Sequence, residues 1–242
     1  MIACDRFCSQ NRAVNSYDRD YALTHSVPAN DWLFDAFVEL LDPQPGWRVL
    51  DVGCNTGELT SRIAALQCRT LGIDLNPDAI ALARQRFPAL EFRAATLPDL
   101  DEYGFDAIVA SHVIEHLHDL DEFLLTARRR LKTDGKFLLA TPNRHAWIRR
   151  LAHRLWGVSF FDDSTHIRFY TARQLRHRLA ACGFQQIVTE TRRLYFPLAA
   201  RLTHSVHLSL PCFGMGDHLF ASAVAPSTQT NGITGKLNRR SA

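Results

Sequence analysis

The sequence predicts an α/β fold, in which a doubly wound parallel sheet has helices on both faces. Four short apolar runs indicate buried strands, at residues 48–52, 70–74, 105–110 and 136–140. Helical patterns alternate with these runs at 58–66, 77–87 and 120–131, and Pro77 stands in a first helical turn, where proline is favoured. Such alternation is typical of parallel strands that are joined by crossover helices.

Further elements flank this core. The segment NDWLFDAFVELLD places Trp32, Leu33 and Phe37 at helical spacing, and Thr171 and Gly183 bracket another helical pattern. Helices are thus predicted at 30–42 and 171–181, and strands at 90–93 (weakly), 184–192 and 218–225. Ligands of such sheets bind at the carboxyl ends of the strands, so the loops after residues 52, 74, 95, 110 and 140 are the candidate site.

The chain of 242 residues is expected to form one domain over 30–225. Residues 1–29 would be an N-terminal arm, and the polar residues 226–242 a disordered tail. Two insertions, 142–165 and 194–215, interrupt the alternation. The first is expected to contain a short amphipathic helix, and the second is expected to be irregular.

Composition places the chain among ordinary globular enzymes. It is 46% hydrophobic and 22% charged, it has no apolar run long enough to span a membrane, and its N-terminus lacks the apolar core of a secretory signal. The six cysteines are scattered without a CxxC pair, which favours free thiols over a disulfide framework. We therefore expect a cytoplasmic protein.

Basic residues gather in one stretch although the formal net charge is only +3. Residues 128–154 contain nine arginines and lysines against one acid, Asp134. This excess suits an anionic substrate, an anionic lipid surface or nucleic acid. A solvated helix face with a basic helix end explains it equally well.

The strongest signal is VLDVGCNTGELT at residues 49–60, where a strand enters a turn with Gly53 and Gly57 before a helix. Such a turn lets the backbone approach a ligand at the helix N-terminus. Asp74 ends the next strand and could accept both hydroxyls of a ribose. The turn lacks the G-x-G-x-x-G dinucleotide fingerprint, and Asp51 beside it favours a cationic group over a pyrophosphate. These residues indicate a nucleoside cofactor with a positively charged amino-acid end.

Residues 49–60 resemble motif I of class I S-adenosylmethionine-dependent methyltransferases, which usually reads D-x-G-C-G-x-G. SHVIEHLHD, ATPNR and THIRFYTARQLRHRLAACGF resemble the branch that contains the ubiquinone-biosynthesis O-methyltransferases, and also methyltransferases of surface-glycan and natural-product pathways. The likeness extends over residues 30–225. It implies a Rossmann-like sheet of seven strands with the last strand antiparallel, and S-adenosyl-L-methionine as the cofactor. Asn55 replaces the usual glycine, and we expect it to keep the turn because Asn tolerates positive φ.

The resemblance also implies the cofactor contacts. Asp74 matches the ribose-binding acid, and the main chain at Ser111 and His112 would line the cofactor. Adenine contacts would follow the third strand, at Ala95, Thr96 and Leu97, although no acidic or amide residue lies between Arg93 and Asp99. The expected cofactor-binding residues are Asp51, Gly53, Cys54, Asn55, Gly57, Asp74, Leu75, Thr96, Leu97, Ser111 and His112.

The segment HVIEHLHD, residues 112–119, has three histidines and two acidic residues. His112, Glu115 and His116 spell the H-x-x-E-H motif of certain zinc proteases, but that site needs both histidines on one helix and no helix start precedes them. Some ubiquinone-pathway O-methyltransferases similar to this chain have an acidic residue, Glu and His at the positions of His112, Glu115 and His116, where a divalent ion is thought to orient the substrate hydroxyls. His112 weakens such a site because hard cations prefer oxygen ligands. We assign no metal ion.

Two histidines are candidates for proton transfer. His116 would take a proton from the substrate, since a neutral imidazole near pH 7 suits that role. Alternatively, Glu115 and His116 pack against neighbouring loops and orient them. His166 lies where the family folds back over the substrate, and it would act either as a base or as a hydrogen-bonding residue near the next helix.

These observations favour a methyltransferase that acts on a small molecule, with an oxygen atom as the favoured acceptor. A sulfonium already makes the methyl carbon electrophilic, so the protein must chiefly align the acceptor and exclude water. The two insertions would form a lid. Its aromatic residues would stack on an aromatic or prenylated substrate or only hold the lid down, namely Trp147, Trp156, Phe160, Phe161, Tyr195 and Phe196. Arg149, Arg150 and Arg154 would suit an acidic group or peripheral contact with a membrane.

Two other functions stay open. RNA or protein methylation is compatible with the basic segment, but we find no separate RNA-binding module and no Asn-Pro-Pro-type motif after FDAIVAS, so a nucleic-acid partner is not expected. A catalytically silent cofactor-binding protein is the other alternative. The intact Asp51, Gly53, Gly57 and Asp74 argue against it.

Overall fold

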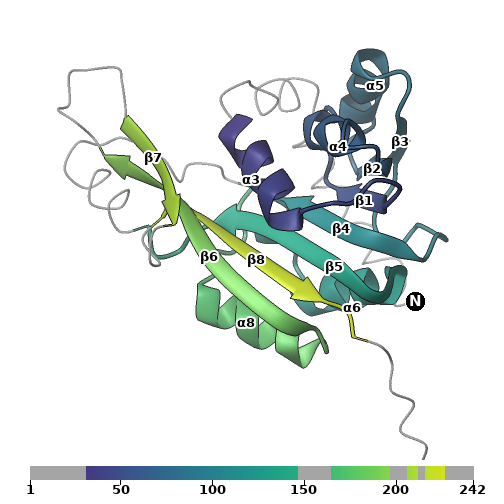
Figure 1. Cartoon of the computed structure of the whole chain (residues 1–242). Helices are drawn as coiled ribbons and strands as arrows, with labels where there is room; N and C mark the ends of the chain where they lie inside the picture. Colours follow the sequence, from purple (N-terminus) through teal and green to yellow (C-terminus); the bar gives the residue numbers. More distant parts are fainter. Residues whose placement is uncertain (1–30, 147–164, 197–205, 212–215, 227–242) are drawn as a thin grey trace, which may run out of the picture.

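The computed structural model describes residues 31–146, 165–196, 206–211 and 216–226, which form one sheet with helices on both faces (Figure 1). The strands are β1 (Arg48–Val52), β2 (Arg69–Asp74), β3 (Glu91–Ala94), β4 (Phe105–Ser111), β5 (Leu131–Pro142), β6 (Gln185–Phe196), β7 (Val206–Pro211) and β8 (His218–Val224). The helices are α3 (Asp31–Leu41), α4 (Glu58–Ala64), α5 (Pro77–Arg86), α6 (Leu120–Arg130) and α8 (Ala172–Ala181), and a 3₁₀ turn, η2 (Ile114–His116), precedes α6.

The sheet has the strand order β3-β2-β1-β4-β5-β8-β6-β7. Strands β1 to β5 are parallel, and β8 runs antiparallel between β5 and β6. The predicted doubly wound sheet of seven strands with an antiparallel last strand is confirmed. From β1 the sheet is extended on one side by β2 and β3 and on the other side by β4 and β5. The topological switch point, where ligands bind in such sheets, therefore lies between β1 and β4 and is bordered by the loops after these two strands.

An eighth strand, β7, pairs antiparallel with β6 at the edge of the sheet. It lies in the segment 194–215, and the expectation that this whole segment is irregular is wrong for residues 206–211. The physical reason lies in the residue pattern, because Val206, Leu208 and Leu210 alternate with polar residues as in a strand. β6 also continues four residues beyond its predicted end at 192 and provides the pairing partner.

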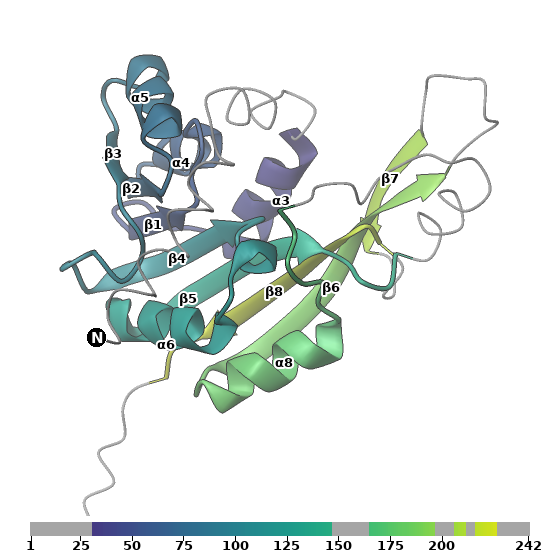
Figure 2. The same ribbon diagram turned by 180° about the vertical axis from the view of Figure 1, so that it is seen from behind.

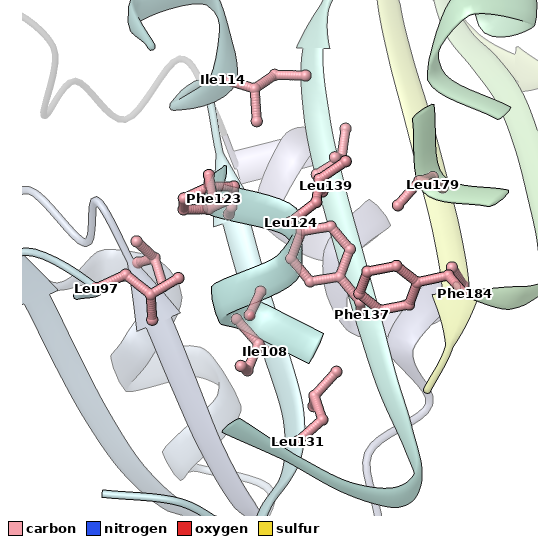
Figure 3. Packing of buried hydrophobic residues seen from close by; sticks show 14 of the residues in the cluster. Leu97, Ile108, Ile114, Phe123, Leu124, Leu131, Phe137, Leu139, Leu179 and Phe184 are labelled. Carbon is pink, nitrogen blue, oxygen red and sulfur yellow. The ribbon is translucent and has the colours of Figure 1, made fainter. Parts of the chain in front are cut away.

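Helices lie on both faces of the sheet (Figure 2), and a cluster of buried apolar side chains fills the space between the sheet and the helices on each face. Helices α6 and α8 pack on one face, and α3 and α4 pack on the other. In the cluster on the α6 and α8 face, the ring of Phe137 in β5 packs between two other aromatic rings (Figure 3). Its centroid is 6.3 Å from that of Phe123 in α6 and 5.4 Å from that of Phe184. This packing fixes β5 against α6 and against the segment between α8 and β6.

Several predicted features lie outside the described residues. They are the N-terminal arm 1–29, residues 227–242 of the tail, and the lid residues Trp147, Arg149, Arg150, Arg154, Trp156, Phe160 and Phe161 with the helix expected there. At the start of the first insertion, β5 continues to Pro142 and Asn143 forms an isolated bridge with Tyr170. None of the helices in the described ranges is long and apolar enough to cross a lipid bilayer.

Candidate functional site

The turn between β1 and α4 contains three residues in the left-handed backbone region. The φ angle is +71° at Gly53, +47° at Asn55 and +85° at Gly57. Glycine adopts this region freely, and asparagine tolerates it better than most residues. The prediction that Asn55 keeps the turn is therefore confirmed. The N–H groups of Gly53 and Cys54 donate to the carbonyl of Ile73 at 2.8 and 3.0 Å, which ties the turn to the end of β2.

Gly53 also has no room for a side chain, because a Cβ atom there would lie 2.4 Å from Cγ2 of Val113 in the loop after β4. We predict that Gly53→Ala lowers the free energy of unfolding by about 1–3 kcal/mol through this clash and the strained backbone. Urea denaturation measures the change. Adding Val113→Ala should recover the part due to the clash, and a double variant that recovers nothing would contradict the packing argument.

Asp51 in β1 is buried beside this turn, with 1% of its surface exposed. Its Oδ2 accepts a hydrogen bond from the Thr60 hydroxyl at 2.6 Å, whereas Oδ1 has no hydrogen-bond partner among the described residues. Burial raises the pKa of Asp51 to about 7; the Thr60 bond opposes this rise, and the charge of Asp74 adds to it. A buried acceptor without a donor is a suitable partner for a cationic group of a ligand.

Asp74 lies at the end of β2 and binds the same turn. Its Oδ2 accepts from the N–H of Asn55 at 2.9 Å, and its Oδ1 accepts from the N–H of Asn76 at 2.8 Å. Burial raises the pKa of Asp74 above its usual range, although these two bonds oppose the rise. A carboxylate has about four lone-pair sites, so Asp74 can still accept from two ribose hydroxyls. Asp51 and Asp74 together fit S-adenosylmethionine, which combines a ribose with an ammonium group.

The other predicted cofactor residues differ in what they can offer. Leu75 is 44% exposed beside Asp74, whereas Leu97 is 2% exposed and packs in the core. Burial raises the pKa of the Cys54 thiol well above its usual range, so Cys54 borders the turn mainly through its backbone. The N–H and hydroxyl of Thr96 both donate to the Asp99 carboxylate. The Asp99 carboxylate therefore lies close to the loop after β3. This acid was missed from the sequence because only the residues between Arg93 and Asp99 were considered, although the T-x-x-D spacing is typical of such a hydrogen-bonded turn.

The loop after β4 places His112 next to a buried carboxylate. His112 has φ +55°, and its Nδ1 lies 2.9 Å from Oε1 of Glu115, whose side chain is fully buried. The other ring nitrogen, Nε2, lies 3.1 Å from Nδ1 of His218 at the start of β8. The His218 ring in turn packs edge-on against Trp32 of α3, with 4.8 Å between centroids. The loop that borders the cofactor turn is therefore connected to β8 directly and, through His218, to α3.

A second histidine pair lies in the same region. Nδ1 of His116 is 3.1 Å from the carbonyl oxygen of Thr165. Because a carbonyl only accepts, Nδ1 carries the hydrogen and Nε2 of the neutral ring carries the lone pair. The ring of His116 lies 4.9 Å from that of His166. The structure thus brings together the two histidines that the sequence proposed independently.

Glu115, His116 and His166 each offer one potential ligand atom, and these atoms lie within 4.8 Å of one another. The Glu115 carboxylate already contacts His112, and its Oε2 accepts from the Thr141 hydroxyl at 3.0 Å. Those contacts favour a structural or electrostatic role over metal binding. The zinc-protease interpretation also fails, since η2 spans only Ile114–His116 and His112 precedes it.

The basic stretch supports the fold where the structure describes it. Each of five basic side chains contacts its own chain, as follows: Arg128 the carbonyl of Cys182, Arg129 the hydroxyl of Thr126, Arg130 the carbonyls of Glu102 and Pro98, Lys132 the carboxylate of Asp106, and Lys136 the carbonyl of Leu41. For these residues, the structural explanation is therefore favoured over binding of an anionic partner.

Comparisons with known proteins agree with this site. A family model for a methyltransferase domain matches residues 24–190. A ubiquinone biosynthesis O-methyltransferase of Rhodopseudomonas palustris is 32% identical over 178 residues, which cover 69% of this chain and 70% of the relative. An S-adenosylmethionine-dependent methyltransferase structure from Thermotoga maritima has a TM-score of 0.63 at 22% identity, covering 88% of this chain and 97% of that one.

A phosphoethanolamine N-methyltransferase 2 of Haemonchus contortus, solved in complex with S-adenosyl-L-methionine, has a TM-score of 0.55 at 16% identity, covering 80% of this chain and 52% of that one. These structures share the fold, and the sequence match over residues 24–190 spans most of the chain. The two carboxylates at the glycine turn fit the same cofactor. The chain therefore belongs to the class I S-adenosylmethionine-dependent methyltransferases, in the branch that contains the ubiquinone biosynthesis O-methyltransferases, and its methyl donor is S-adenosyl-L-methionine.

Proposed function

We propose that this enzyme transfers its methyl group to an oxygen atom of a small molecule. The observation that carries the proposal is the pair His116 and His166, which lies at the carboxyl edge of the sheet. A hydroxyl is a weak nucleophile until its proton is removed, so an oxygen-directed enzyme needs a base at this place. The relative from Rhodopseudomonas palustris, named as an O-methyltransferase, supports the same acceptor atom.

His116 is the residue that we propose as this base. The Thr165 carbonyl holds its Nδ1–H and thereby leaves the proton-accepting nitrogen, Nε2, on the other side of the ring. The ring of His166 packs against that of His116 at a tilt of 53° and restricts the His116 ring to this orientation. When bound, the cofactor supplies an electrophilic methyl carbon; the chain supplies alignment, exclusion of water and proton removal.

Asp51 and the main chain at Gly53, Asn55 and Gly57 are proposed to hold the amino-acid end of the cofactor, and Asp74 its ribose. Thr96, Asp99 and Leu75 would border the adenine, with Ser111 and His112 between the cofactor and the acceptor. We propose that the reaction needs no metal ion, because His112 and Thr141 already contact the Glu115 carboxylate.

The test begins with calorimetric titration of the protein with S-adenosylhomocysteine. We predict micromolar binding that Asp74→Ala weakens at least about 100-fold, because Asp74 would accept from two ribose hydroxyls and hydrogen bonds to a charged group contribute about 1.5–3 kcal/mol each. Asp101→Ala, which removes an exposed carboxylate between β3 and β4, serves as the control and should bind like the original protein.

Phenols, hydroxy acids and sugar nucleotides are then screened as acceptors, with and without a chelator, and products are identified by mass spectrometry. An O-methylated product in both conditions supports the proposal. Methylation of nitrogen or carbon only, or complete loss of activity with the chelator, would contradict it. Methylation of RNA with no small-molecule product would favour the alternative function.

A further inference from the structure

One buried carboxylate lies between the two histidine pairs of the site. The side chain of Glu115 has no exposed surface, and its Oε1 lies 2.9 Å from Nδ1 of His112, which contacts His218 in turn. On the other side, a carboxylate oxygen lies within 4.8 Å of a ring nitrogen of His116 and of His166. The charge of this single residue is therefore close to both pairs.

The backbone of Glu115 holds the segment that orients His116. Its carbonyl oxygen accepts from the N–H groups of Ile167 and Arg168 at 2.8 and 3.2 Å. Two residues earlier in that segment, the Thr165 carbonyl contacts Nδ1 of His116. Glu115 thus positions the proposed base through its main chain as well as through its neighbours.

Glu115 stays ionised although it is buried. Burial alone would raise the pKa of its carboxyl, but the side-chain contact with His112 and the charges of His112 and His116 lower the pKa below its usual range. The Thr141 hydroxyl satisfies the second oxygen. Among the described residues, the titratable side chains that face this carboxylate, directly or through one ring, are His112, His116, His166 and His218.

We propose that Glu115 is a positioning residue whose negative charge stabilises the imidazolium that forms when the acceptor loses its proton. The inference rests on the proposed O-methylation. In that step the acceptor O–H bond breaks and the proton moves to Nε2 of His116, while the O–CH₃ bond forms and the C–S bond breaks with its electron pair left on sulfur. A charge this close to His116 acts strongly because the buried surroundings screen it far less than water does.

Glu115→Gln tests the charge while it keeps the size of the side chain and its bond to Thr141. We expect kcat at pH 7 to fall about thirtyfold, the affinity for S-adenosylhomocysteine to stay within threefold, and the acidic limb of the kcat profile to move about one unit to lower pH. Glu115→Asp keeps the charge but moves it away, so the limb should move part of the way in the same direction. Rates are measured with the best acceptor of the screen, starting from 3,4-dihydroxybenzoate.

A purely structural role would lower kcat without moving the limb, so an unmoved limb in both variants overturns the inference. If Glu115→Gln does not fold, the Asp variant alone decides in the same way. In a His116→Asn background, Glu115→Gln should cause little further loss, because the charge acts through that base. A chelator that reproduces the loss in the original protein would also overturn the inference, in favour of a metal ion. Absence of any O-methylated product from the original protein would instead refute the proposed function.

Discussion

His116→Asn is expected to lower kcat by about 100- to 1,000-fold while the affinity for S-adenosylhomocysteine stays within about threefold. A positioned general base contributes about 10²- to 10⁴-fold to such a step. The asparagine amide can replace Nδ1–H as the donor to the Thr165 carbonyl, but it has no group in the place of Nε2. The variant therefore keeps the local structure and removes only the proton acceptor.

Stopped assays of product formation measure kcat, and calorimetry measures the affinity. His118→Asn is the matched control, because His118 belongs to the same segment but is exposed, and its kcat should be unchanged. Equal activity of His116→Asn and the control would refute the role of His116. A parallel loss of cofactor affinity and activity in His116→Asn would assign His116 to the structure of the loop.

The fold and the cofactor end of the site could be predicted because their signals are local. Strand and helix periods alternate between residues 48 and 140. The residues of the glycine turn and Asp74 each stand within a few sequence positions of a strand end. Even the departure at Asn55 was predictable, since positive φ is a property of single residues and asparagine tolerates it. Asp51 and Asp74 follow from the same local pattern.

The acceptor side could not be predicted to the same depth, because its contacts join distant parts of the chain. His112 and His218 touch across 106 positions of sequence, and His116 meets Thr165 across 49. No pattern within a window of ten residues specifies such pairs. The role proposed for Glu115 depends on contacts with Thr141 of β5 and with Ile167 and Arg168 before α8, so sequence reasoning could only leave its metal-binding and packing interpretations open.

Asp51→Asn is expected to have opposite effects on stability and on binding. At pH 8 it should raise the free energy of unfolding of the cofactor-free protein by about 2–3 kcal/mol and weaken the binding of S-adenosylhomocysteine about 1,000-fold. The binding loss follows from removal of the buried negative partner of the cofactor's ammonium group, since breaking such a pair costs about 3–5 kcal/mol.

The stability gain follows from the raised pKa of Asp51. Burial raises this pKa from 3.8 to about 7, so the folded chain binds more protons than the unfolded chain between these two values. Stability therefore falls as the pH rises through this window, and the full penalty, about 4 kcal/mol, is present above pH 7. Asparagine carries no charge and removes the penalty, but its amide N–H group would lie at the position of Oδ1, which is buried without a partner among the described residues, and this costs about 1–2 kcal/mol.

Chemical denaturation at pH 5 and pH 8 tests the sign directly. The advantage of Asp51→Asn should shrink to about zero at pH 5, where the original carboxyl is largely protonated in the folded chain. A saturating concentration of S-adenosylhomocysteine should reverse the order at pH 8, since only the original protein binds it tightly. A variant that is less stable than the original protein at pH 8 without ligand would show that Asp51 is not a strained buried charge. The site would then hold the ammonium group without a cost to the fold.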